Sequence, residues 1–429
     1  MNILFHTDIL LDDYTVLKDG YLGVTGDTIT YIGAEKPQET YEITRKLDRH
    51  LLIPGLYNLH THSPMVLLRG LGSALPLHRW LEEAVFPIEA RLTDADVSVG
   101  TRLAMMEMLA SGTVSFTDMY DHTRITAREV EQAGMKANLN RPVIALDRTE
   151  PYEQNLHVAD SLAFFDDCKG MGDGRIIADF GIHAEYTSHA DVVRKYGEAC
   201  KERGAIMHLH LSETRKEQEE CKARNGGRTP AQWFNDLGVF DNPTIAAHCV
   251  MLEPGDIEIL CEKSVTAVHN PSSNMKLASG FMPVSSMLAA GAKLAIGTDG
   301  AASNNNLNMI EEMHLASIIH KGYTGDPTLL SPQELLSMAT IAGAKAQGRK
   351  HCGALKVGNR ADIVALDLDK PHLMPIHDIP ALLVYALQGS DVAMTMVDGS
   401  ILYEKGEYLT IDAARVRYDL DKSMARLFS

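Results

Sequence analysis

PGLYNLHTHSPMVLLRG, residues 54–70, is the stretch that decides the fold. It opens a series, from Gly55 to about residue 350, of short apolar runs that are each followed by a longer amphipathic stretch. This alternation is typical of parallel β/α units, in which a buried strand is followed by a helix that covers it. We therefore expect the middle of the chain to have an α/β fold.

Eight of the apolar runs are candidate strands, and eight strands separated by helices would close a (β/α)8 barrel of the TIM type. The runs are residues 56–62, 113–119, 137–146, 176–183, 205–211, 244–250, 265–270 and 293–299. The helix after the first run is expected to begin after Thr93 and to end before Gly112, because these residue types favour helix starts and stops.

Both ends of the chain alternate short β-rich runs with Gly and Asp turn residues. Residues 2–10 and 20–34 show this pattern near the start, and residues 360–368 and 392–409 show it near the end. Chain termini commonly lie close together, so we expect the two ends to pair. We predict a small β-sandwich domain built from residues 1–55 and 351–429, with the barrel of residues 56–350 inserted between them.

The composition is that of an ordinary globular protein, with 45% hydrophobic and 23% charged residues among 429. The formal net charge of −17 disfavours nucleic acid and anionic membranes as partners. The six cysteines never form a C-x-x-C pattern, the amino terminus lacks the basic residues of a signal peptide, and no run reaches about 18 apolar residues. We expect a cytoplasmic protein that acts on a small molecule; assembly into a homo-oligomer is left open.

Histidines and an acid recur at the ends of the predicted strands. His60 and His62 lie two residues apart on the first strand, so their side chains share a face. His210, His248 and Asp299 close the fifth, sixth and eighth strands, at the end of the barrel where active sites form. Nitrogen and oxygen donors without thiolates suit Zn²⁺, although Fe²⁺ or Mn²⁺ would tolerate them. The sequence predicts a divalent metal site.

Glu213 follows His210 by three residues, where its carboxylate could pass a proton to a substrate ring nitrogen. The other interpretation is a carboxylate that caps the next helix. With a metal that activates water, Asp299 would take the water proton and His248 would stabilise the developing oxygen charge. We expect hydrolytic displacement at a carbonyl or at an amino-substituted heteroaromatic carbon. His208 and His269 are expected to support the site rather than bind the ion.

Four segments together resemble the amidohydrolase superfamily and, within it, the mononuclear deaminases. They are residues 54–70, HLHLSET (208–214), AAHC (246–249) and GTDGAASNNNLNM (297–309). The resemblance implies one metal ion held by four ligands, with His248 catalytic but not a ligand. The implied ligands are His60, His62, His210 and Asp299.

Within that branch the chain is most similar to the 5′-methylthioadenosine/S-adenosylhomocysteine deaminases. This similarity implies replacement of the C6 amino group of an adenosine-type nucleoside: 5′-methylthioadenosine, S-adenosylhomocysteine, 5′-deoxyadenosine or adenosine. Glu89, in RWLEEAVFPIEARL (79–92), would hold the ribose hydroxyls. The full set of implied substrate contacts is Trp80, Glu89, Arg141, His183, Glu213 and Asp299.

Two positions depart from the pattern of these deaminases. Where they usually read H-S-P-Y, this chain has HAEY (183–186), and Pro151 stands in the gapless position of a second arginine, with Arg148 three residues earlier. We expect Glu185 to add negative charge near the pocket mouth and so to disfavour the carboxylate tail of S-adenosylhomocysteine.

Two other functions are compatible with the same residues. One is a related aminohydrolase acting on guanine, a pterin, a triazine or another aminated ring. The other is a barrel that lost catalysis and serves as a binding module. A polynucleotide deaminase is disfavoured, because its H-x-E and P-C-x-x-C motifs are absent.

Overall fold

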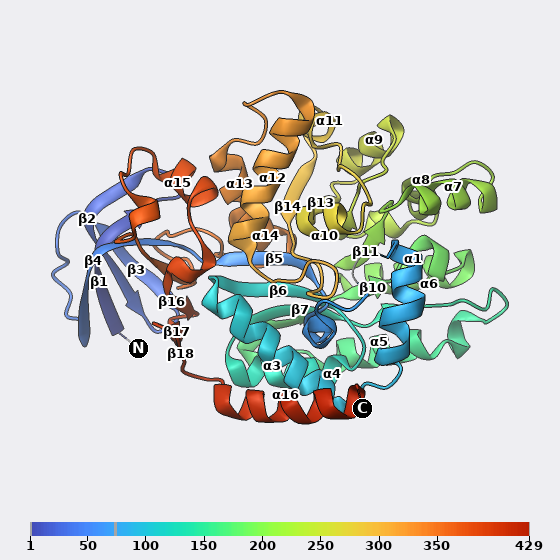
Figure 1. Ribbon diagram of the computed structural model, residues 1–429, viewed down its shortest axis with the longest axis horizontal. Helices are drawn as coiled ribbons and strands as arrows, with labels where there is room; N and C mark the ends of the chain where they lie inside the picture. Colours follow the sequence, from blue (N-terminus) through green and yellow to red (C-terminus); the bar gives the residue numbers. More distant parts are fainter. Residues whose placement is uncertain (1, 73–74, 429) are drawn as a thin grey trace.

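The structure of the protein is a computed structural model that describes residues 2–72 and 75–428. A sheet formed by the two ends of the chain lies beside a barrel surrounded by helices (Figure 1). Among the described residues, none of the helices has both the length and the apolar character needed to cross a membrane.

All eight predicted barrel runs contain strand, so these positions are confirmed. The strands are β5 (Leu56–Thr61), β6 (Thr113–Met119), β7 (Lys136–Asn140), β8 (Pro142–Val143), β9 (Ile176–Ala178), β10 (Phe180–Ile182), β11 (Met207–Leu211), β12 (Thr244–His248), β13 (Thr266–His269) and β14 (Lys293–Ile296). The third and fourth predicted strands are each interrupted by one residue, Arg141 and Asp179. The ladders, all parallel, run β5-β6-β7-β9 and β8-β10-β11-β12-β13-β14.

The barrel closes where the chain after β14 meets β5. The Asp299 N–H donates to the His60 carbonyl at 2.9 Å, and the Thr298 N–H donates to the Asn58 side chain at 3.0 Å. A Cβ atom on Gly297 would lie 2.8 Å from the His60 nitrogen, closer than real Cβ contacts. The close approach of the two strands therefore requires glycine at this position.

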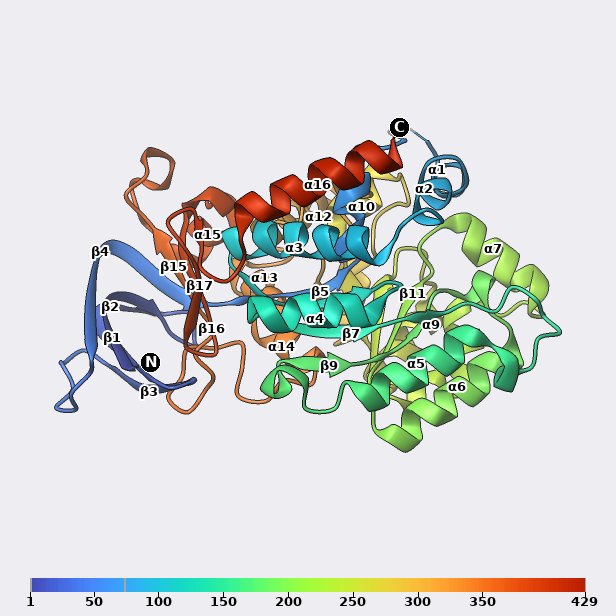
Figure 2. The same ribbon diagram turned by 90° about the horizontal axis from the view of Figure 1, so that it is seen from below.

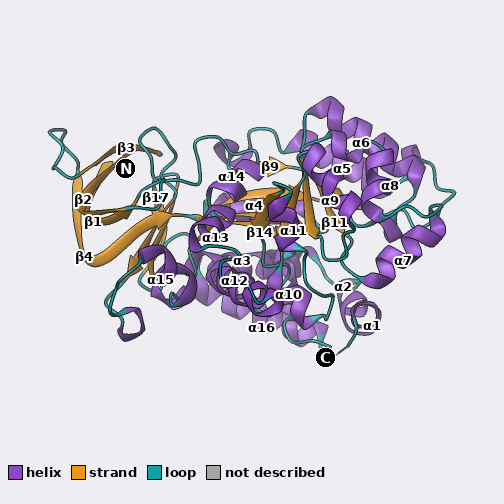
Figure 3. Cartoon of the chain, turned by 90° about the horizontal axis from the view of Figure 1, so that it is seen from above, coloured by secondary structure: helices purple, strands orange, loops and turns teal. Residues whose placement is uncertain are grey.

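Helices surround the barrel strands (Figure 3). They are α1 (Leu77–Trp80), α2 (Phe86–Glu89), α3 (Asp94–Ala110), α4 (Thr123–Ala133), α5 (Leu156–Asp167), α6 (Ala190–Arg203), α7 (Arg215–Arg224), α8 (Pro230–Asp236), α9 (Pro254–Glu262), α10 (Pro271–Lys276), α11 (Val284–Ala289), α12 (Met309–Thr324), α13 (Pro332–Ala339) and α14 (Ile341–Ala346). The predicted start of α3 is confirmed, because the Thr93 N–H donates to the Asp96 side chain at 2.7 Å.

The two ends of the chain pair as expected. Their strands are β1 (Asn2–Leu10), β2 (Val16–Thr25), β3 (Thr28–Gly33), β4 (Ile43–Pro54), β15 (Ile363–Asp367), β16 (Val392–Val397), β17 (Ser400–Glu404) and β18 (Glu407–Tyr408). They form one continuous eight-stranded sheet in the order β18-β17-β16-β15-β4-β1-β2-β3. This pairing does not confirm a two-layered sandwich. β1 and β4 pair in parallel rather than antiparallel, because β2 and β3 form the crossover between them.

Two helices near the carboxyl terminus were not foreseen, α15 (Ile379–Tyr385) and α16 (Ala413–Leu427). α16 runs alongside α3, away from the terminal sheet (Figure 2). Arg102 of α3 pairs with Asp419 of α16 at 3.0 Å, and Val416 is buried with apolar residues of α3. The last segment of the chain therefore returns to the barrel.

The closing contact predicts a stability effect at Gly297. We expect Gly297→Ala to lower the free energy of unfolding by about 1–3 kcal/mol, because the new Cβ would overlap the backbone of β5. Gly322→Ala is the matched control: Gly322 lies in α12 with nothing near its Cβ position, and alanine there should stabilise by about 0.5–1 kcal/mol. Chemical denaturation followed by circular dichroism measures both. Equal stability of Gly297→Ala and the native chain would contradict this account of closure.

Candidate active site

The predicted metal-binding residues meet at the carboxyl ends of the barrel strands. His60 is on β5 and His62 follows it, His210 is on β11, His248 ends β12, and Asp299 follows β14. His248 and Asp299 have left-handed backbones, with φ of 74° and 62°. Non-glycine residues in this conformation carry strain and gather at functional sites, where the chain must turn sharply to aim a side chain.

The donor atoms of four of these residues have the spacing of a metal site. Asp299 Oδ1 lies 3.4 Å from His60 Nε2 and 3.3 Å from His62 Nε2, and His62 Nε2 lies 3.4 Å from His210 Nε2. In a tetrahedral zinc site with bonds of about 2.0–2.1 Å, neighbouring donors are about 3.3 Å apart. The three measured separations match that value.

The far nitrogen of each histidine ring is engaged by the protein. Nδ1 of His62 donates to the Met119 carbonyl at 2.6 Å, and Nδ1 of His210 donates to the His183 carbonyl at 2.7 Å. Nδ1 of His60 lies 2.9 Å from Nε2 of His208. These contacts fix the ring orientations, as supporting contacts of metal-binding histidines do, and leave each Nε2 facing the centre.

One nitrogen at the centre of the cluster lacks a partner that a bound cation would supply. His60 is fully buried, and its Nε2 has no hydrogen-bond partner among the described residues. Burial lowers the pKa of His60 to about 3. Histidine binds a metal in its neutral form, through a ring nitrogen that is not engaged in a hydrogen bond. The Nε2 of His60 meets this condition and faces the other potential ligand atoms. The residues present therefore fit a divalent ion.

Asp299 is oriented by hydroxyl groups. Its Oδ2 accepts hydrogen bonds from Ser273 Oγ at 2.6 Å and Ser303 Oγ at 2.7 Å, and its Oδ1 accepts from the Gly300 N–H. Burial would raise the pKa of Asp299, but the contacts with His60 and His62 outweigh burial and hold it well below the usual range. The group is thus a carboxylate with Oδ1 turned toward the histidines.

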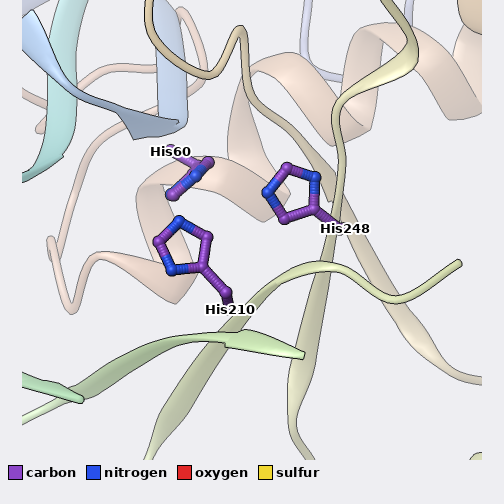
Figure 4. Close-up of side chains that lie close together, drawn as sticks. All are labelled: His60, His210 and His248. Atoms are coloured by element: carbon purple, nitrogen blue, oxygen red, sulfur yellow. The ribbon is translucent and has the colours of Figure 1, made fainter. Parts of the chain in front are cut away.

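His248 belongs to the same cluster, and its ring faces those of His60 and His210 (Figure 4). The three rings could hold an ion by themselves, as could His60, His62 and Asp299. The Nδ1 of His248 donates to Asn274 Oδ1 at 2.9 Å, and its Nε2 lies 3.8 Å from Glu213 Oε2. This position beside Glu213 suits a group that acts on substrate.

Glu213 is buried next to the cluster rather than exposed at a helix start. Its Oε1 accepts a hydrogen bond from Ser279 Oγ at 3.0 Å. The N-cap of α7 is the next residue, Thr214, whose Oγ1 accepts from the Glu217 N–H. The helix-capping interpretation of Glu213 is therefore not supported, and its carboxylate is available to the cavity.

The cluster lies in a cavity of about 370 Å³. Its polar lining includes His62, His183, His210, Glu213, His248 and Asp299. Apolar side chains supply much of the remaining wall, among them Met65, Leu77, Trp80, Leu81, Val85, Phe86, Ile144 and Leu277. The segment with α1 and α2 thus contributes an apolar wall to a cavity that is polar around the cluster.

Trp80 and Glu89 both line the cavity, as predicted from sequence. The Trp80 Nε1–H donates to the Leu71 carbonyl at 2.9 Å, so its ring is held in place. Glu89 Oε1 accepts from the Tyr120 hydroxyl at 2.6 Å. Burial raises the pKa of Glu89, and the bond from Tyr120 only partly offsets this effect. A half-buried carboxylate with one oxygen still available favours a ligand that donates hydrogen bonds.

Of the other two predicted substrate-contact residues, one lines the cavity and the other does not. His183 lines the cavity, and burial lowers its pKa to about 4, so its ring is neutral. Arg141 is not among the lining residues. Its guanidinium is bound by Asp121 at 2.7 Å and by Asp160 at 3.0 Å.

The expectation for Glu185 is corrected by the structure. Its side chain is 2% exposed, pairs with Arg224 at 2.5 Å and accepts from Asn225 at 2.7 Å. It is not among the cavity-lining residues. A neutralised carboxylate outside the cavity does not repel a substrate tail, so the argument based on its charge was wrong.

Sequence reasoning missed the residues that orient the predicted groups, namely Tyr120, Ser273, Asn274, Ser279 and Ser303. Their types are common, and nothing in their spacing distinguishes them. His208 supports His60 as expected, and His269 pairs with His320 at 2.9 Å.

The sequence matches the Amidohydrolase family over residues 51–402. The chain belongs to this family. It is 42% identical over 415 residues to a protein of Pelotomaculum thermopropionicum named 5-methylthioadenosine/S-adenosylhomocysteine deaminase, covering 96% of this chain and 95% of that one. It is 42% identical over 400 residues to the 5'-deoxyadenosine deaminase of Methanosarcina acetivorans, covering 93% and 91%.

A solved structure extends the similarity to the whole fold. It is an adenosine deaminase from Xanthomonas campestris with bound zinc, which superposes with a TM-score of 0.93 and 30% identity over 100% of this chain and 98% of that one. Similarity at this level covers the terminal sheet as well as the barrel.

The donor geometry predicts that His210→Ala loses metal. Removing one Nε2 from the cluster should weaken metal binding by more than the roughly 10- to 100-fold that loss of a supporting hydrogen bond costs. Elemental analysis after dialysis measures the metal bound per chain. His377→Ala, which removes an exposed histidine outside this cluster, is the control and should keep native metal content. Equal metal content in the two variants would remove His210 from the ligand set.

Proposed function

We propose that this amidohydrolase is a metal-dependent deaminase that replaces the C6 amino group of an adenosine-type nucleoside with water and releases ammonia. The observation that carries the proposal is the row of donor atoms 3.3–3.4 Å apart, set in one cavity with Glu213 and Glu89. The names of the relatives support the same reaction, since they include two kinds of nucleoside deaminase.

The proposed ligands are His60, His62, His210 and Asp299, and the proposed ion is zinc. Three nitrogens and one carboxylate oxygen suit zinc, and the Xanthomonas campestris structure contains it. A divalent ion held here would act as a Lewis acid and lower the pKa of a water molecule toward 7.

Three side chains are proposed to move protons or stabilise charge. Glu213 would donate a proton to the purine ring nitrogen next to C6, which makes that carbon more electrophilic. The Asp299 carboxylate would accept the proton of the attacking water and pass it to the departing amino group, and His248 would stabilise the oxygen charge that develops. Addition of water at C6 followed by departure of ammonia leaves the oxo ring of an inosine analogue.

The remaining contacts would orient the nucleoside. Glu89 would accept from the ribose hydroxyls, because Tyr120 occupies only one of its oxygens. Trp80 would pack against the substrate, and His183 would donate to or accept from the base. Arg141 is proposed as an outer contact whose guanidinium is held in place by Asp121 and Asp160.

The lining favours an uncharged 5′ substituent. No lysine or arginine is among the described residues that line the cavity, so a carboxylate on the 5′ substituent would meet no cationic side chain there. Apolar side chains of the segment with α1 and α2 suit a methylthio group or a plain methyl group. We therefore propose 5′-methylthioadenosine and 5′-deoxyadenosine as the preferred substrates.

The domain division and cellular location are also proposals. We assign residues 56–350 to the catalytic barrel and residues 1–55 and 351–429 to a terminal domain, with α16 packed back on the barrel. A cytoplasmic location is supported by six free cysteines in the structure.

Ammonia release and the ultraviolet shift from adenine to hypoxanthine test the function. The metal-loaded enzyme should turn over 5′-methylthioadenosine and 5′-deoxyadenosine with a kcat/KM at least about tenfold higher than for S-adenosylhomocysteine, because the carboxylate of the latter would find no lysine or arginine in the cavity lining. Equal use of S-adenosylhomocysteine would contradict only the proposed specificity. Inactivity of the folded, metal-loaded protein on every adenosine analogue would contradict the proposed function.

The role of Glu89 predicts an effect confined to binding. Tyr120→Phe removes the hydroxyl that orients Glu89 and should raise KM for 5′-methylthioadenosine about tenfold while kcat changes little, because this contact is equal in ground and transition states. Glu89→Gln should raise KM further. Steady-state kinetics with nucleoside substrates measures both. An unchanged KM in Glu89→Gln would show that the carboxylate does not hold the ribose.

A further inference from the structure

Glu217 is a buried carboxylate that the proposed mechanism does not use. It lies in the first turn of α7, is 3% exposed, and is not among the cavity-lining residues. Its two oxygens each accept a backbone hydrogen bond. Oε1 accepts from the Ser212 N–H at 2.9 Å, and Oε2 accepts from the Glu213 N–H at 2.7 Å.

These bonds are not those of an ordinary helix cap. In a capping box the glutamate at the third helical position reaches back to the N–H of the N-cap residue, which here is Thr214. Thr214 Oγ1 does accept from the Glu217 N–H, at 3.2 Å. The Glu217 carboxylate, however, reaches one and two residues further back, to the backbone that carries Glu213.

The peptide held by Glu217 is also tied to the strand end that carries His248. The Ser212 carbonyl accepts from the Val250 N–H at 3.1 Å and from the Met251 N–H at 2.8 Å. Ser212 itself has a left-handed backbone, with φ of 48°. Glu217 therefore fixes a strained turn that connects the segments of Glu213 and His248.

A neutral side chain at position 217 would accept the two backbone hydrogen bonds less well than a carboxylate. Burial raises the pKa of Glu217 to about 7, and the charge of Glu213 adds to this effect, although the backbone N–H groups oppose it. Glutamine would avoid this desolvation but offers one acceptor for two N–H groups. Hydrogen bonds to an ionised acceptor are also shorter and stronger than neutral ones. The two converging backbone N–H groups therefore favour a carboxylate at this position despite the desolvation cost of burying it.

We infer that Glu217 is a positioning residue that holds the carboxylate of Glu213 beside His248 in the geometry needed for proton transfer. This inference rests on the proposed deaminase function. The Glu213 to His248 contact, at 3.8 Å between Oε2 and Nε2, is the geometry at stake. A small displacement of a proton donor slows the chemical step more than it weakens substrate binding.

The test compares Glu217→Gln and Glu217→Ala with Glu219→Gln. Glu219 is an exposed acid on the same helix, so its variant removes the same charge without touching the turn. With 5′-methylthioadenosine we expect kcat to fall about 10- to 100-fold in both Glu217 variants, with KM within about threefold of native and metal content unchanged. Glu219→Gln should behave as the native enzyme, and Glu213→Gln sets the lower limit of kcat.

The outcomes separate positioning from general stability. Native kcat in Glu217→Gln would overturn the inference, as would a loss that comes through KM or through metal content. If Glu217→Ala does not fold, the kcat of the nearly isosteric Glu217→Gln variant tests the inference by itself. An active native enzyme with an unaffected Glu217→Gln variant refutes this inference only, whereas an inactive native enzyme refutes the proposed function.

Discussion

The contact that closes the barrel is the constraint on which the site depends. The hydrogen bond from the Asp299 N–H to the His60 carbonyl joins the last strand to the first, and Gly297 allows the two backbones to approach. Without this closure Asp299 would lie on an open sheet edge, far from His60 and His62. Closure brings residues about 240 positions apart in the chain to the 3.3–3.4 Å separations of a metal site. The proposed catalytic centre is therefore a product of the same contact that completes the fold.

Hydrogen-bond partners explain how the polar side chains of the site can be buried close together. The structure gives each histidine a partner for Nδ1, gives Asp299 two hydroxyl donors, and gives Glu217 two backbone donors. Each contact compensates part of the cost of removing a polar group from water. The Nε2 of His60 has no hydrogen-bond partner among the described residues, and a cation at the centre would provide one. The contacts that offset the desolvation cost of these polar groups therefore also fix their orientation.

Strand positions and the proposed metal-binding motif could be predicted because both depend on short-range patterns. The apolar runs located every barrel strand, and the H-x-H spacing at residues 60–62 placed two rings on one face. Topological detail was less predictable: β1 and β4 pair in parallel, and α16 packs on α3. Both depend on which distant surface an element meets, and an amphipathic face alone does not specify its partner.

The sequence by itself determined the fold class, the family and the set of residues proposed to bind the metal, since residue type and local spacing carry that information. Only the tertiary structure decided what each charged side chain does. From its sequence position Glu185 is expected to repel an anionic substrate, but in the structure Arg224, 39 residues away, neutralises it. Glu89 gained its orientation from Tyr120, and Glu217 its role from the peptide of Ser212. The physical reason is that a buried charge takes its function from its partners, and folding chooses those partners across distances that sequence spacing does not encode.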